Sequence, residues 1–175
     1  MTIKKNLIAI LVIAIGLSFK FTIANAQDGD ISKWIPDPSE VVSTVIVISP
    51  PGLMTRAPLT AKQLLGFGCN STTDSKNIFN LIDIIKNNVQ NEKNEAGQFY
   101  LRNVIYLNLK NGSTIRYLFS DANNRNNEIY GGAENGGIGS YIPFLAQSGF
   151  LVDLRKWLLN DSVMQQSGKW CVENQ

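Results

Sequence analysis

The sequence predicts an α+β domain with a small, largely antiparallel sheet packed against two or more helices and closed by one disulfide. Three observations lead to this class. The almost wholly β-branched run VVSTVIVI at residues 41–48 is typical of a buried strand. Two alternating segments within residues 99–119 flank the hairpin signal Asn111-Gly112, and apolar residues at helical spacing fill residues 78–89.

The first 26 residues have the layout of a secretory signal peptide. Lys4-Lys5 is followed by the apolar run 7–17 and by Ala24-Asn25-Ala26, small residues of the kind found at a cleavage site. The unbroken run is shorter than the roughly 20 residues that cross a bilayer, and Lys20 interrupts its continuation. These features favour a cleaved signal over the alternative, an uncleaved N-terminal anchor.

Residues 27–175 are then the mature chain, and 149 residues suit a single domain with one core. Three of the sixteen Lys and Arg residues lie in the signal and none of the fourteen Asp and Glu residues do, so the mature net charge is −1. This balance offers no clustered cations for nucleic acid. We expect a periplasmic or secreted protein with no membrane span after signal removal.

The two cysteines, Cys69 and Cys171, both lie in the mature chain. An even number in an exported protein favours a disulfide between them. Free buried thiols or a redox pair are the alternatives, although a redox pair usually has the C-x-x-C spacing that is missing here.

Helix and strand boundaries follow from local signals. The strand 41–48, expected to be central in its sheet, is stopped by Pro50-Pro51. Thr60 and Gln63 have capping-box spacing and predict a short helix from Ala61 that ends near Gly66 or Gly68. A second helix begins at Asp74-Ser75, and its apolar stripe comprises Ile78, Leu81, Ile82, Ile85 and Val89.

The register of the hairpin follows from its side chains. A three-residue loop, residues 110–112 with Gly112 in the left-handed conformation, gathers the apolar odd-numbered positions on one face. These are Ile105, Leu107, Leu109, Ile115, Tyr117 and Phe119. The other face carries Arg102, Tyr106, Asn108 and Arg116, with Val104 and Leu118 at its far end, and is expected to be partly wet. Its Arg102, Tyr106 and Arg116 make it a second candidate binding surface, the alternative being an ordinary solvated sheet face.

Residues 120–140 show no periodicity, which predicts a long loop of functional or mobile character. Pro143 is expected to open a short helix, and the apolar spacing within residues 151–158 predicts another. The disulfide from Cys171 to Cys69 would join the C-terminal tail, from Asp161 onward, to the end of the first helix.

The glycine-rich segment 131–140 fits no cofactor motif. Gly137-Ile138-Gly139 lacks the third glycine of a dinucleotide fingerprint, and no lysine follows as a P-loop requires. The chain contains no histidine, which excludes Ser-His-Asp and Cys-His catalysis. Asp121-x-Asn123-x-Arg125 resembles the start of a calcium loop but places an arginine at a ligand position. We therefore expect no cofactor and no metal.

A protein-binding surface is the function this composition favours. Loops rich in glycine and asparagine and flanked by tyrosines combine adaptability with large anchors. The candidate partner-binding residues are Asn124, Arg125, Glu128, Tyr130, Glu134, Asn135 and Tyr141. The hypothesis is an exported binding module, an inhibitor or immunity-type protein that blocks a toxin or hydrolase. The alternatives are a carboxylate-dependent envelope hydrolase and an accessory ligand-binding subunit of an envelope complex.

Overall fold

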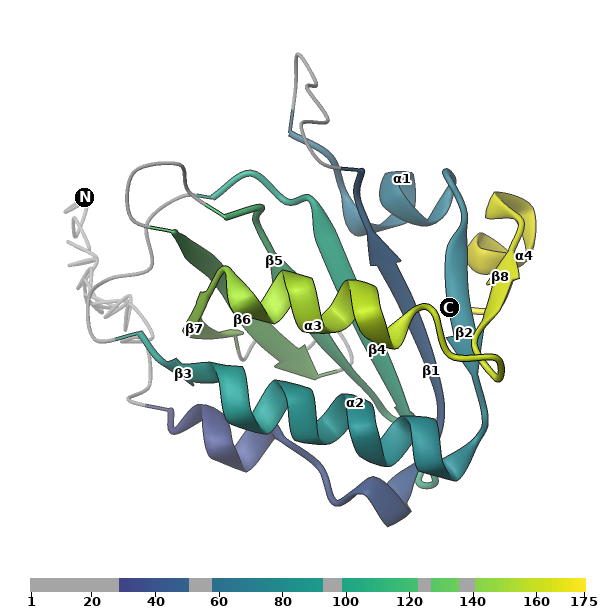
Figure 1. Ribbon diagram of the computed structural model, residues 1–175, viewed down its shortest axis with the longest axis horizontal. Coiled ribbons are helices and arrows are strands. Elements are labelled where there is room, and N and C mark those ends of the chain that lie inside the picture. Colours follow the sequence, from purple (N-terminus) through teal and green to yellow (C-terminus); the bar gives the residue numbers. More distant parts are fainter. Residues whose placement is uncertain (1–28, 51–57, 93–98, 123–126, 136–140) are drawn as a thin grey trace, which may run out of the picture.

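The computed structural model describes residues 29–50, 58–92, 99–122, 127–135 and 141–175. Their strands form one sheet of eight, in the order β3-β7-β6-β5-β4-β1-β2-β8, and every pairing is antiparallel (Figure 1). The strands are β1 (Val41–Ile48), β2 (Cys69–Thr72), β3 (Val89–Asn91), β4 (Asn103–Leu109), β5 (Thr114–Phe119), β6 (Glu128–Asn135), β7 (Tyr141–Gln147) and β8 (Met164–Gln166). The helices are α1 (Ala61–Leu65), α2 (Ser75–Asn88), α3 (Gly149–Trp157) and α4 (Gly168–Glu173), with 3₁₀ turns η1 (Ile31–Trp34) and η2 (Pro38–Glu40). The predicted α+β class is confirmed.

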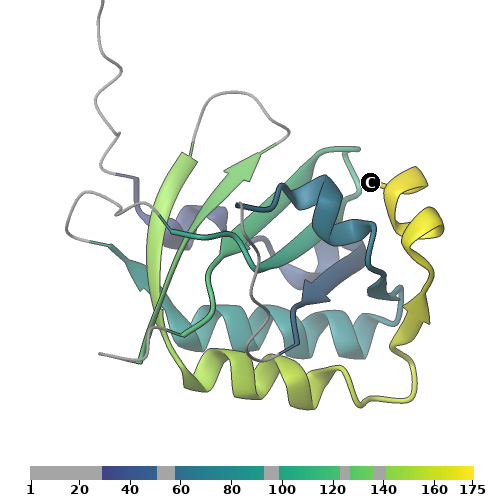
Figure 2. The ribbon, with the colours of Figure 1, turned by 90° about the horizontal axis from the view of Figure 1, so that it is seen from above.

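Helices α2 and α3 lie side by side across one face of the sheet (Figure 2). The main core lies between them and the strands, because each helix turns its apolar stripe inward. Its largest fully buried side chains include Tyr117, Phe119, Phe144 and Phe150. The Trp157 indole also donates to the Asn77 carbonyl oxygen at 2.8 Å, which joins α3 to the first turn of α2.

A second, smaller core lies on the opposite face. There α1 and α4 cover the part of the sheet built from β1, β2 and β4. Its buried residues are Val45, Val47, Leu64, Leu65, Cys69, Val104, Tyr106 and Cys171. Strand β1 is therefore covered on both faces and lies inside the sheet, as its β-branched sequence predicts.

The helix starts follow the local signals in the sequence. Thr60 accepts from the Gln63 amide and the Gln63 side chain returns to the Thr60 amide, so the predicted capping box is present. Asp74 caps α2 by accepting from the Asn77 amide at 2.8 Å. Ile78, Leu81, Ile82 and Ile85 of the predicted stripe are buried on α2, whereas Val89, although buried, lies in β3 because the helix ends at Asn88.

The hairpin has the predicted register. Leu107 lies opposite Ile115 and Ile105 lies opposite Tyr117. Gly112, the last residue of the three-residue loop, has a φ of 81°. This is the left-handed conformation, which glycine adopts more readily than any other residue. On the other face Tyr106 and Val104 are buried in the core under α1, whereas Arg102, Asn108, Arg116 and Leu118 are half-buried, so the face is partly wet as predicted.

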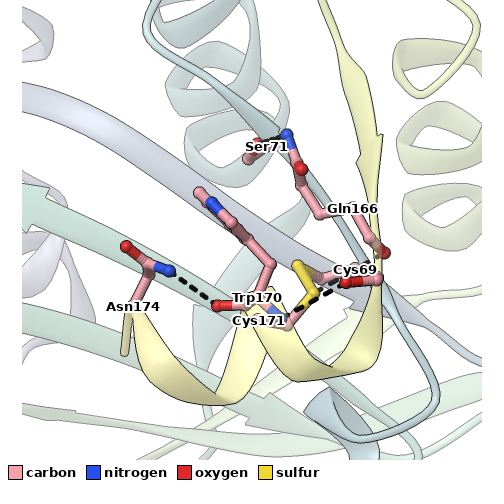
Figure 3. The surroundings of a disulfide bond; sticks show 7 residues. Cys69, Ser71, Gln166, Trp170, Cys171 and Asn174 are labelled. Carbon is pink, nitrogen blue, oxygen red and sulfur yellow. Dashed lines mark hydrogen bonds between the residues drawn. A yellow bond between two sulfur atoms is a disulfide. The ribbon is translucent and has the colours of Figure 1, made fainter.

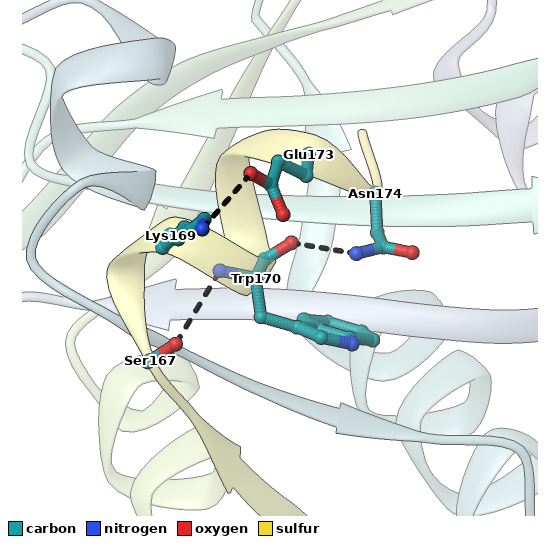
Figure 4. Close-up of polar contacts among 5 residues, drawn as sticks. All are labelled: Ser167, Lys169, Trp170, Glu173 and Asn174. Carbon is teal, nitrogen blue, oxygen red and sulfur yellow. Dashed lines mark hydrogen bonds and ion pairs between the residues drawn. The ribbon is translucent and has the colours of Figure 1, made fainter.

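The predicted disulfide joins Cys69 at the start of β2 to Cys171 in α4, 102 residues apart with Cα atoms at 6.0 Å (Figure 3). Helix α4 also has its own caps (Figure 4): Ser167 accepts from the Trp170 amide, and the Asn174 side chain donates to the Trp170 carbonyl. A disulfide of this kind is compatible with an extracellular or periplasmic location.

Two sequence-based predictions are wrong. Residues 120–140 are not one long loop, because 128–135 form β6, and Pro143 opens no helix, because it lies inside β7. Because glycine and proline are depleted in strands, the sequence did not indicate β6 or β7. Pro143 is tolerated because it lies just outside the part of β7, Phe144–Ala146, that pairs with β3.

Among the described helices, none has the length and apolar content needed to cross a bilayer. The predicted signal peptide, residues 1–26, lies outside the described residues.

Candidate functional site

The candidate site is the part of the sheet that the described helices leave uncovered. Helices α2 and α3 cover one face, and α1 and α4 cover the β1, β2 and β4 end of the other (Figure 2). The remaining part of that second face belongs to β5, β6 and β7, and we call it the open face.

Four polar side chains form one row. Arg116, Glu134 and Tyr141 lie on the open face, and Tyr106 continues the row beneath α1, where it is only 5% exposed. Tyr106 on β4 lies opposite Arg116 on β5, Arg116 opposite Glu134 on β6, and Glu134 opposite Tyr141 on β7. Directly opposite residues of neighbouring strands project to the same side of a sheet. The strand pairing therefore brings together residues that are up to 35 positions apart in the chain.

An ion pair forms the centre of the row. Arg116 Nη2 lies 2.8 Å from Glu134 Oε1, with the two side chains 29% and 24% exposed. The Arg116 Nε is buried without a hydrogen-bond partner among the described residues. The pair is thus partly desolvated, which strengthens its attraction relative to a fully exposed pair.

The two tyrosines at the ends of the row stay protonated at neutral pH. Burial, aided by the Glu134 carboxylate, raises the pKa of Tyr141 to about 12. Burial also raises the pKa of Tyr106, and the Arg116 charge partly opposes that rise. Both phenols therefore remain hydrogen-bond donors at neutral pH, and Tyr141 is the more exposed of the two.

Glycine at position 132 makes room for Tyr141. A Cβ built on Gly132 would lie 1.9 Å from the Tyr141 Cζ, so the ring lies over the bare glycine backbone. An aromatic ring that covers a strand glycine supplies the packing that the glycine lacks. Tyr141 nevertheless keeps 40% of its surface exposed and is available to a partner.

The neighbouring Gly131 allows close packing on the opposite, helix-covered face of the sheet. A Cβ there would lie 2.5 Å from the Phe144 ring and 2.6 Å from the Leu118 carbonyl oxygen, inside the main core. Two glycines that predict a flexible loop in the sequence are therefore needed for packing within a strand.

The remaining predicted partner residues are divided. Glu128 and Tyr130 lie on the open face towards the other end of β6, and the Tyr130 hydroxyl donates to Glu128 Oε2 at 2.6 Å. Asn135 lies opposite Ile115 and so belongs to the helix-covered side, at the exposed end of β6. Asn124 and Arg125 lie outside the described residues.

Sequence reasoning placed Arg116 and Tyr106 on a second candidate surface, apart from Glu134 and Tyr141. The pairing of β5 with β6 unites the two surfaces. Arg102, the third residue of that second surface, is not in the row. Its guanidinium lies 5.8 Å from the centre of the Tyr100 ring, and its Nη1 donates to the Leu101 carbonyl.

Within the described residues, no three His, Cys, Asp or Glu side chains are grouped as metal ligands. Of the weak calcium pattern only Asp121 is described. Its carboxylate accepts from the Asn103 amide at 3.4 Å.

No family model, no curated protein and no solved structure matches the chain.

Proposed function

We propose that this protein is an exported protein-binding module that docks a folded partner on its open face. The observation that carries the proposal is the row Arg116–Glu134–Tyr141 on the part of the sheet not covered by described helices, which Tyr106 continues beneath α1. Tyrosine and arginine are the side chains that most often dominate binding energy at protein interfaces. The partner is expected to place a polar, hydrogen-bonding surface against the Tyr141 phenol and the ion pair.

A rigid scaffold supports this role. The row lies on four paired strands whose other side is fixed by α2 and α3, so its side chains are held before a partner arrives. Preorganised groups lose less conformational entropy on binding, which leaves more of the contact energy for affinity. An inhibitor or immunity-type protein that blocks a toxin or hydrolase fits such a fixed surface.

The described acids on the open face do not favour the hydrolase alternative. Glu128 and Glu134 are six residues apart on one strand, or about 20 Å at 3.3 Å per residue. A pair of glycosidase carboxylates lies at most about 9.5 Å apart. Glu134 is also engaged in the 2.8 Å ion pair with Arg116.

The test uses the oxidised mature chain as bait in extracts of the producing cell's envelope and of competing strains. A protein captured by this bait is purified and its stoichiometry and affinity are measured with the parent chain and two variants. We expect a 1:1 complex that Tyr141→Ala weakens by about tenfold or more, as expected for an aromatic anchor. Val152→Ala is the matched control, because Val152 is 48% exposed on α3 and lies away from the open face.

Circular dichroism of each variant checks that the sheet is intact. A captured protein whose affinity is unchanged by Tyr141→Ala and by Glu134→Lys contradicts docking on the open face. Turnover of cell-wall fragments by the purified chain, abolished by a single Asp or Glu replacement, would support the hydrolase instead.

A further inference from the structure

A separate cavity of about 320 Å³ opens beside α1, where β1 continues beyond the last residue that it pairs with β2. Its apolar wall comes from Val47, Leu64 and Phe67. The side chain of Phe67 is 72% exposed, which is unusual for a ring that size and leaves apolar surface at the mouth. The volume falls in the range of about 300–1,000 Å³ that is typical of ligand sites.

The backbone of β1 is open towards this cavity. On one side β1 pairs with β4 as far as Ile48, whereas on the other its pairing with β2 stops at Ile46. The Ser49 amide donates to the Asn103 side chain on β4 at 3.0 Å. Because successive residues of a strand point their backbone groups to opposite sides, the Ile48 N–H and C=O point to the β2 side, beyond the end of that ladder.

Polar side chains complete the cavity. Asn70 on β2 and Gln165 on β8 lie opposite each other and both line it. Neither side-chain amide has a hydrogen-bond partner among the described residues. Each supplies both donors and an acceptor. The cavity therefore combines an apolar wall, one open strand position and two free amides.

From this combination we infer that the cavity binds a short extended peptide segment with one large apolar side chain. The peptide backbone pairs with Ile48 and continues the ladder that β2 leaves unfinished, as in recognition by strand addition. Its apolar side chain, of the size of leucine or phenylalanine, enters between Leu64 and Phe67. The two amides bond the flanking peptide groups. The inference does not rest on the function proposed for the open face.

The experiment titrates the isotope-labelled, oxidised chain with acetylated and amidated pentapeptides Thr-Thr-X-Thr-Lys, where X is Leu, Phe, Ala or Asp. We expect the Leu and Phe peptides to shift the amide resonances of Ile48, Gly68 and Cys69 in a saturable way. The Asp peptide should bind at least about tenfold more weakly, because its carboxylate would lose water in the apolar cavity. A peptide N-methylated at X should also bind more weakly, because it lacks the N–H that pairs with Ile48.

Two variants locate the site. Phe67→Ala should weaken the Leu peptide by about fivefold, since it removes one apolar wall. Leu159→Ala, which removes an apolar side chain that is 82% exposed after α3, should leave the affinity unchanged. Absence of saturable shifts, equal binding of the Leu and Asp peptides, or no effect of N-methylation would each overturn the inference.

Discussion

Removing the disulfide gives the sharpest test of how the C-terminal helix is held. Cys69→Ala with Cys171→Ala deletes both sulfurs, and alanine is the right replacement because the two side chains are only 2% and 0% exposed. A serine there would bury a hydroxyl without an assured partner. The bond closes a loop across 102 residues. In the chain-entropy model such a loop lowers the entropy of the unfolded chain by about 16 cal/mol/K, or about 4.7 kcal/mol at room temperature.

The expected result is a loss of roughly 4–5 kcal/mol in the free energy of unfolding, measured by urea or guanidinium titration. For a chain of about 150 residues this corresponds to a fall in Tm of about 15 °C. The parent chain treated with a reductant should match the double variant, because both lack the same constraint. A loss below about 1.5 kcal/mol in both would refute the reasoning, since the unfolded chain would then gain little freedom when the bond is removed.

Three further predictions concern the glycines and the tyrosine of β6 and β7 and the hairpin. Gly131→Ala should lower the free energy of unfolding by up to about 3 kcal/mol, more than Gly132→Ala does. The added Cβ at Gly131 meets a backbone oxygen at 2.6 Å, whereas that at Gly132 meets the movable end of the Tyr141 side chain. Equal losses in denaturant titration would contradict the packing described. Gly112→Ala should cost about 1 kcal/mol from backbone strain alone, because its φ is 81° and no atom lies within 4 Å of the added Cβ; an unchanged Tm would show that the loop relaxes. Because folding favours the neutral phenol of Tyr141, the contribution of this phenol to stability is complete below its ordinary pKa of 10.0 and is lost as the pH rises to about 12. Ultraviolet titration of the parent chain against Tyr141→Phe isolates this group. Its ionisation near pH 10.0 would contradict the burial.

Local signals predicted the elements that depend on local chemistry. The capping box at Thr60, the strand at 41–48 and the register around Gly112 each follow from side chains within a few residues of one another. The single pair of cysteines predicted the link to α4. These features needed no knowledge of the rest of the fold.

The missed elements depend on contacts across the sheet. Nothing near Gly131 in the sequence shows that Phe144 will occupy the space of its missing side chain. The row of the open face likewise exists only because β5 pairs with β6, which brings Arg116 to Glu134. Residue composition suggested a tyrosine-flanked binding loop, and the structure instead places Tyr130 and Tyr141 on strands.

The two outermost strands of the described sheet, β3 and β8, are only three residues long. An exposed long edge is a template on which other copies of a chain can stack into aggregates. Edge strands this short offer few backbone hydrogen bonds to another copy of the chain. Concentrated solutions of the oxidised protein should therefore stay free of fibrils. Both ends of the described sheet therefore offer few unpaired backbone groups to a neighbouring copy of the chain.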